Sequence, residues 1–199
     1  MATVLGASAR VEVPVARVTE TAHSLLALSP ARPDGHRLMV WAVAPSAIDG
    51  SRGAADALAA VVRGLAGRAL EGIALVVFDP HGDVAANATE IAKAIGGTTD
   101  LVIVLDSVAG ERLRAMTIYD DLFLPIDHYA DAAGAPHART LTEDEPDWPT
   151  GLSAFGRSKY VLLRGAGSAR ANVDLRPDAA AIVAFAIARY TSESPELHQ

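Results

Sequence analysis

The sequence contains no cysteine, which excludes disulfide bonds, thiolate nucleophiles and thiolate metal sites. A protein-bound metal would therefore need histidine and carboxylate ligands. Long apolar runs are also missing, since no stretch reaches the ~20 consecutive apolar residues that a membrane-spanning helix needs. Residues 1–15 have neither the basic segment nor the continuous apolar segment of a signal peptide. We expect a soluble, cytoplasmic protein that has no membrane partner.

Basic residues are fewer than acidic residues. The chain has 17 lysine and arginine residues against 24 aspartate and glutamate residues, a net charge of −7. This balance disfavours binding to a nucleic-acid backbone, so the expected partner is a protein or peptide, and homo- or hetero-oligomers stay open. With 199 residues the chain fits one domain that buries roughly 70% of the surface its unfolded form exposes. We predict a single α/β domain over residues 1–199.

Continuously apolar runs predict strands buried on both faces of one sheet. The runs are RLMVWAVA (37–44), IALVVF (73–78), DLVIVL (100–105) and KYVLLR (159–164). Short connections between the first three indicate parallel pairing with right-handed crossovers. Residues 1–16 alternate valine with polar residues, and Pro14 restricts this segment to a sheet edge. Residues 18–26 fit a helical face, while HSLLAL (23–28) could equally be a short strand.

Helical apolar spacing occurs at residues 53–70 and again at 84–95, where Asp83 is suited to cap the start. Another helix should begin at Pro177, and residues 192–199 should form a flexible tail. Ser107 suits the N-cap of a helix beginning near Gly110. Residues 117–157 have no sustained period, and their acidic run is expected to be a solvated loop. Together these elements predict an α/β fold with three αβα layers and a mainly parallel sheet.

Acidic and imidazole side chains follow two of the predicted strands. Asp79 and His81 come after residues 73–78, Asp106 comes after residues 100–105, and Asp56 lies in the first turn of the helix at 53–70. Because the carboxyl ends of parallel strands share one sheet edge, Asp56, His81 and Asp106 are candidate metal ligands that would converge there. Each also has a purely structural interpretation: a favourable helix-dipole position for Asp56, a polar turn for His81 and a strand end for Asp106.

Three motifs resemble the core of zinc aminopeptidases of the M28 type. GAAD at 53–56 is similar to the family's bridging-aspartate segment, FDPHGD at 78–83 stands at the position of its paired glutamates, and LDSVAG at 105–110 resembles its last aspartate segment. The resemblance covers most of the chain and implies a peptidase-like fold. It also implies metal-ligand roles for Asp56 and Asp106.

Several ligand positions of that family hold other residues here. The first metal histidine would fall at Ala44 or Pro45, and His81 lies in the region of the glutamates. In the closing motif the histidine position holds Lys159 when chain order is kept, whereas Asp127-His128 keeps the aspartate-histidine pair earlier in the chain. At best, Asp56, Asp106 and either His81 or His128 remain, fewer than a two-zinc site needs.

The leading hypothesis is therefore a non-catalytic binding or scaffold protein with no cofactor and no assigned catalytic residue. The alternative is a divergent metal-dependent hydrolase that uses zinc or another divalent metal bound by Asp56, His81 and Asp106, with His128 as a further candidate. A second resemblance is to the caspase-like fold, whose HG and DACxSG motifs correspond to His81-Gly82 and Asp106-Ser107. The nucleophilic cysteine is absent, so this resemblance implies an inactive relative.

Overall fold

A computed structural model describes residues 7–13, 22–44, 53–81, 83–117, 132–135, 138–140, 152–155, 159–167 and 173–192. Its strands are β1 (Ala7–Val13), β2 (Ala22–Leu28), β3 (His36–Val43), β4 (Ile73–Phe78), β5 (Thr98–Leu105), β6 (Arg112–Thr117), β7 (Ala138–Thr140) and β8 (Lys159–Ala166). Its helices are α1 (Gly53–Gly64), α2 (Val84–Ile95), the 3-10 helix η1 (Leu152–Phe155) and α4 (Arg176–Ser192).

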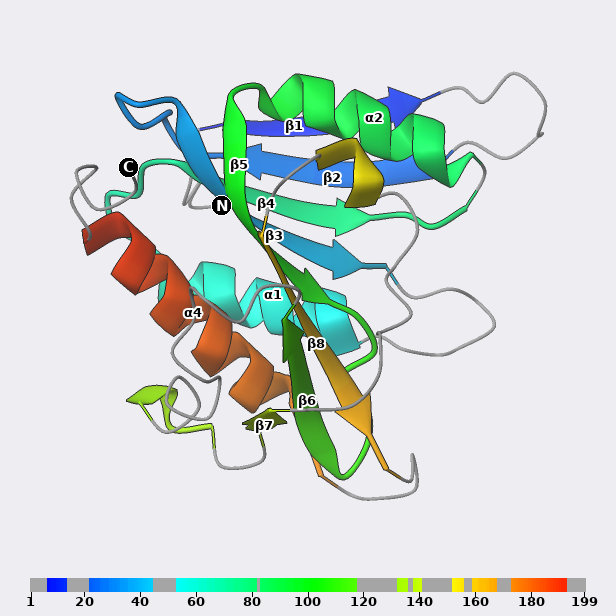
Figure 1. Cartoon of the computed structure of the whole chain (residues 1–199), viewed down its shortest axis with the longest axis vertical. Coiled ribbons are helices and arrows are strands. Elements are labelled where there is room, and N and C mark those ends of the chain that lie inside the picture. Colours follow the sequence, from blue (N-terminus) through cyan, green and yellow to red (C-terminus); the bar gives the residue numbers. More distant parts are fainter. Residues whose placement is uncertain are drawn as a thin grey trace.

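Within these ranges the strands form one eight-stranded sheet in the order β1-β2-β4-β3-β5-β8-β6-β7 (Figure 1). The four apolar runs are confirmed as neighbouring strands, since β4, β3, β5 and β8 pair in parallel. Antiparallel pairs extend the sheet at both sides, through β1, β2 and β4 on one side and β8 and β6 on the other. The fold is mixed α/β with a mostly parallel sheet, as the sequence predicts.

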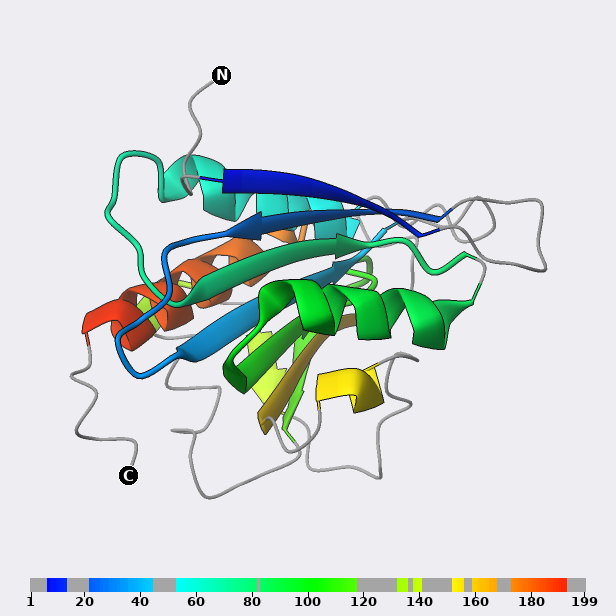
Figure 2. The same cartoon turned by 90° about the horizontal axis from the view of Figure 1, so that it is seen from above.

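Alternating side chains of the central strand separate two apolar clusters. Leu38 and Val40 of β3 pack with α1 and α4, whereas Met39 and Trp41 pack with α2. All four side chains are fully buried. Figure 2 shows α2 on one side of the sheet, with α1 and α4 on the other. A strand that is buried on both faces has no polar alternation, which is why its sequence reads as one apolar run.

The structure corrects one local prediction and decides another. Residues Arg112–Thr117 form strand β6, not a helix, so Ser107 is not a helix N-cap. The backbone N–H of Glu111 donates to the carbonyl of Ala166, which commits the chain to pairing with β8. The ambiguous segment near residue 22 becomes strand β2, because its backbone pairs with β1 and β4 at once.

Helix α1 ends at Gly64, short of the end at residue 70 that the sequence predicts, whereas the boundaries of α2 follow the local signals. The carboxylate of Asp83 accepts a hydrogen bond from the backbone N–H of Ala86 and caps α2, as expected. Gly96 and Gly97, with φ of 60° and 73°, end this helix in the left-handed region. Residues 193–199, which include most of the expected tail, lie outside the described residues. None of the described helices is long and apolar enough to span a bilayer.

Candidate functional site

The carboxyl ends of the parallel strands carry the residues that the sequence singles out. Asp79 follows β4 and Asp106 follows β5, and between them β3 ends at Val43 and Ala44. The start of α1 reaches the same edge, because the space beside Gly53 is filled by Val108. A Cβ at Gly53 would lie 2.3 Å from the Val108 side chain, so only glycine permits this approach.

Asp106 is bound by an arginine from the neighbouring strand. Nε and Nη2 of Arg164, near the end of β8, both lie 2.7 Å from Oδ2 of Asp106. The parallel register explains the contact, since Leu105 pairs with Leu163 one residue earlier. Both contacts go to one carboxylate oxygen, and such charge-assisted hydrogen bonds are stronger than neutral ones.

Asp56 also pairs with an arginine. Nη1 of Arg176, at the start of α4, lies 3.2 Å from Oδ2 of Asp56. The same guanidinium forms shorter bonds to both carboxylate oxygens of Asp174, at 2.8 Å from Nε and 2.9 Å from Nη2. These bonds raise the pKa of Arg176, and the arginine lowers the pKa of Asp174. The Asp56 carboxylate thus links α1 to α4, a role that the sequence did not reveal.

Asp79 and His81 form a third polar group. Oδ1 of Asp79 lies 2.6 Å from Nδ1 of His81 and also accepts the His81 backbone N–H, while Oδ2 accepts the backbone N–H of His23. Partial burial acts to raise the pKa of Asp79, but these hydrogen bonds outweigh it and the pKa is lowered. Asn87 of α2 donates to the carbonyl of His81 and holds the turn against the helix. The imidazole is therefore oriented by a carboxylate, and its side chain is 46% exposed.

Asp79 and Asp106 follow strands that lie on opposite sides of β3. Asp106 is bound from β8 and Asp79 from β2, and both strands lie on the sides away from β3. With strands spaced at about 4.8 Å, β4 and β5 are separated by roughly 9–10 Å. Ala44, which follows the end of β3 between them, has no side-chain ligand atom. Among the described residues no three histidine, aspartate or glutamate side chains are grouped as a metal ion would require. The three-ligand site stays a prediction, and His128 lies outside the described residues.

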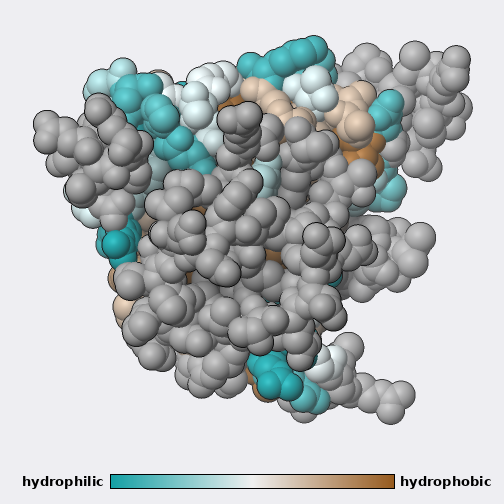
Figure 3. Space-filling model, viewed as in Figure 1, coloured by the Kyte–Doolittle hydropathy of each residue, from teal (hydrophilic) through white to brown (hydrophobic). Residues whose placement is uncertain are grey.

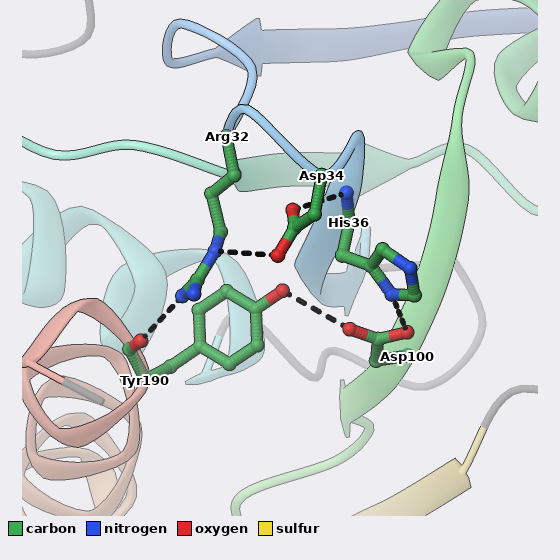
Figure 4. A network of polar contacts seen from close by, with 5 residues as sticks. All are labelled: Arg32, Asp34, His36, Asp100 and Tyr190. Carbon is green, nitrogen blue, oxygen red and sulfur yellow. Dashed lines mark hydrogen bonds and ion pairs between the residues drawn. The ribbon is translucent and has the colours of Figure 1, made fainter. Parts of the chain in front are cut away.

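A second polar cluster occupies the opposite, amino edge of the sheet (Figure 4). The buried Arg32 donates to the carbonyl of Tyr190 at 2.9 Å, and its guanidinium lies 5.0 Å from the centre of that residue's ring. Nε of Arg32 lies 3.5 Å from Asp34. Asp100 lies 2.6 Å from Nδ1 of His36 and accepts the Tyr190 hydroxyl at 3.3 Å. This cluster, which was not predicted from the sequence, connects the end of α4 to β3 and β5.

The Tyr190 hydroxyl predicts a dependence of stability on alkaline pH. Burial and the Asp100 carboxylate raise its pKa above the ordinary value. Above about pH 10 the unfolded chain releases the tyrosine proton while the folded chain keeps it, so folding stability falls as pH rises. We expect the Tyr190→Phe variant to lose less stability than the wild type between neutral pH and this range. Urea unfolding at several pH values measures the unfolding free energy of both proteins. An equal loss of stability with rising pH in the two proteins would contradict a raised pKa for Tyr190.

Comparison with solved structures identifies the class of fold. It is shared with metallopeptidase-like hydrolases. Legionella pneumophila LapA aminopeptidase matches with a TM-score of 0.61 at 8% identity, over 96% of this chain and 60% of its own. Porphyromonas gingivalis glutaminyl cyclase matches with a TM-score of 0.58 at 14% identity, over 93% of this chain and 82% of its own. Legionella pneumophila LapB matches with a TM-score of 0.63 at 8% identity, over 94% of this chain and 60% of its own.

Identities this low establish a shared fold and no more. This chain spans 61% of the length of one LapA structure. No family model matches the chain, and no curated protein matches its sequence. The peptidase-like fold expected from the sequence motifs therefore agrees with the solved structures, whereas the caspase-like alternative stays a prediction.

Proposed function

We propose that this chain is a non-catalytic binding or scaffold protein on an M28 peptidase-like, three-layer α/β fold. The observation that carries the proposal is the pairing of both family-matched aspartates with arginines, Asp106 with Arg164 and Asp56 with Arg176. Each guanidinium offsets the charge of its aspartate and binds the Oδ2 atom, whose charge and lone pairs a metal ion would also need.

The remaining donors do not fit a two-zinc centre. Ala44 offers no ligand atom at the end of β3, and Asp79 is engaged by His23 and His81. A catalytic zinc site usually has three protein ligands. We propose instead that the carboxyl edge, with its paired charges, is a surface for a protein or peptide partner.

One observation favours a second candidate, a divergent metal-dependent hydrolase that uses Asp56, His81 and Asp106. The Asp79 carboxylate holds Nδ1 of His81, which fixes the ring and leaves Nε2 as the coordinating atom. Metal-bound histidines are commonly oriented by a carboxylate in this way. Such a site would require Asp56 and Asp106 to release their arginines.

Metal analysis of protein purified without a chelating column separates the two candidates. We expect less than about a tenth of an equivalent of zinc, manganese or iron, because the carboxylates are already paired. Adding these metals should not raise the unfolding temperature. The protein should also not hydrolyse aminoacyl substrates with these metals present.

The His81→Asn variant serves as the control for adventitious binding. Near-stoichiometric metal in the wild type that is lost in His81→Asn would support the hydrolase and sink the binding-protein proposal. Metal that is retained in His81→Asn would lie elsewhere, and the proposal for this edge would stand.

A further inference from the structure

Arginines lie at paired register positions on β8, β6 and β7, the last three strands at one edge of the sheet. Arg164 of β8 is the register partner of Arg114 of β6, and Arg114 is the register partner of Arg139 of β7. We call these three positions the arginine row. Directly opposed residues have Cβ atoms about 4.5–5.5 Å apart, and like charges placed there destabilise a sheet. In a chain with a net charge of −7, Arg114 and Arg164 are therefore like charges placed directly opposite each other.

Among the described carboxylates, Asp106 compensates for one arginine of the row. Asp106 pairs with Arg164, the first member of the row. Within the part of the chain that the structure describes, no carboxylate pairs with Arg114. Its Nε–H is buried and has no hydrogen-bond partner. A charged donor that is buried without a hydrogen-bond partner destabilises the fold, and an acceptor near Arg114 would reduce this cost.

The row lies on the side of the sheet that carries α2, beyond the part of the sheet that α2 covers. Leu113 and Leu163 belong to the cluster under α1 and α4, so their neighbours Arg114 and Arg164 point to the other face. On that face α2 packs against β1, β2 and η1. The exposed Arg112 extends the positive charge along β6. Figure 3 shows hydrophilic residues at the lower end of the molecule, where β6 begins and β8 ends.

We propose that the arginine row binds an oxyanion, the carboxylate or phosphate group of a small molecule or peptide, with Arg114 as its main contact. The planar guanidinium fork matches carboxylate and phosphate oxygens, and an anion bound to the partly exposed Arg114 side chain would offset the like charges of Arg114 and Arg164. This inference goes beyond the proposed function and does not depend on whether the chain binds a metal.

The test compares thermal unfolding of the full chain in sodium chloride, inorganic phosphate and citrate at matched ionic strength. We expect phosphate, citrate or both to raise the unfolding temperature of the wild type relative to chloride. The phosphate arm reports a phosphate site and the citrate arm a carboxylate site. In the Arg114→Gln variant the apparent affinity should fall about tenfold or more, because the neutral side chain cannot form the charged fork. In chloride alone this variant should be as stable as the wild type or more so, since a like-charge contact is removed.

Two further variants keep the proposal falsifiable. Arg63→Gln removes an exposed arginine in the last turn of α1, away from the row, and should leave the anion response unchanged. Arg114→Lys keeps the charge without the fork, and it carries the test if Arg114→Gln does not fold. A wild type that does not respond to either anion, or an Arg114→Lys response equal to that of the wild type, overturns the proposal. So does an equal loss in Arg63→Gln and Arg114→Gln.

Discussion

The Val76→Asp substitution is expected to destabilise the protein by about 3–5 kcal/mol, because it would bury an unpaired carboxylate. Val76 is fully buried in β4, where its register partners are Leu26 of β2 and Trp41 of β3. The buried cluster that contains it is apolar and includes Leu26 and Trp41. A loss of this size is a large part of the roughly 5–15 kcal/mol that stabilises a typical domain.

Leu25→Asp is the matched control for this substitution. Leu25 lies on neighbouring β2, one register position away from Leu26, and is 54% exposed on the opposite face. We expect it to change the unfolding free energy by less than about 1 kcal/mol. Urea unfolding followed by circular dichroism measures both variants. Equal losses would mean that the faces assigned to β2 and β4 are wrong.

The Arg32→Ala substitution should cost about 2–4 kcal/mol, through loss of a buried charged hydrogen bond, an ion pair and a cation–π contact. Its partners are the carbonyl and ring of Tyr190 and the carboxylate of Asp34. The stem of Arg32 also covers Gly72, where a Cβ would lie 2.6 Å from Cγ of the arginine. The substitution would therefore leave a cavity as well as an unsatisfied carbonyl.

Arg68→Ala provides the comparison, since Arg68 is an exposed arginine in the connection after α1. It should change the stability little. Arg32→Lys should retain most of the loss, because an ammonium group cannot reproduce the planar contacts. Denaturant unfolding near neutral pH compares the three variants. A loss in Arg32→Ala no greater than that in Arg68→Ala would show that the amino-edge cluster does not stabilise α4.

How far the sequence predicts the fold depends on whether the signal is local. Residues 37–44 and 73–78 are recognisable as strands because both faces are buried, and Gly96-Gly97 marks a helix end through its own backbone preference. Strand β6 was missed because RLRAMT is compatible with a helix. Pairing with β8, some fifty residues further along the chain, decides its structure.

The candidate site is harder to predict from the sequence, because its contacts also join residues that are far apart in the chain. The sequence placed Asp56, Asp79 and Asp106 correctly at strand and helix ends, but it did not reveal their partners. Arg176 is 120 residues from Asp56, and Arg164 is 58 residues from Asp106. Nothing in the spacing of single residues encodes such pairs. A run of arginines at alternate positions, as at Arg112 and Arg114, is the signal that sequence reasoning could have used for the β6 surface.

The two ends of α4 have a consequence for biosynthesis. One end is attached to α1 through Arg176, and the other is attached to Arg32, which lies 158 residues earlier than its partner Tyr190. As the chain leaves the ribosome, the sheet face beside α1 stays without its second helix until α4 has emerged. At roughly 5–20 residues per second, that exposure lasts on the order of ten seconds. During this time we expect chaperones that bind exposed apolar surfaces to bind the uncovered face of the sheet.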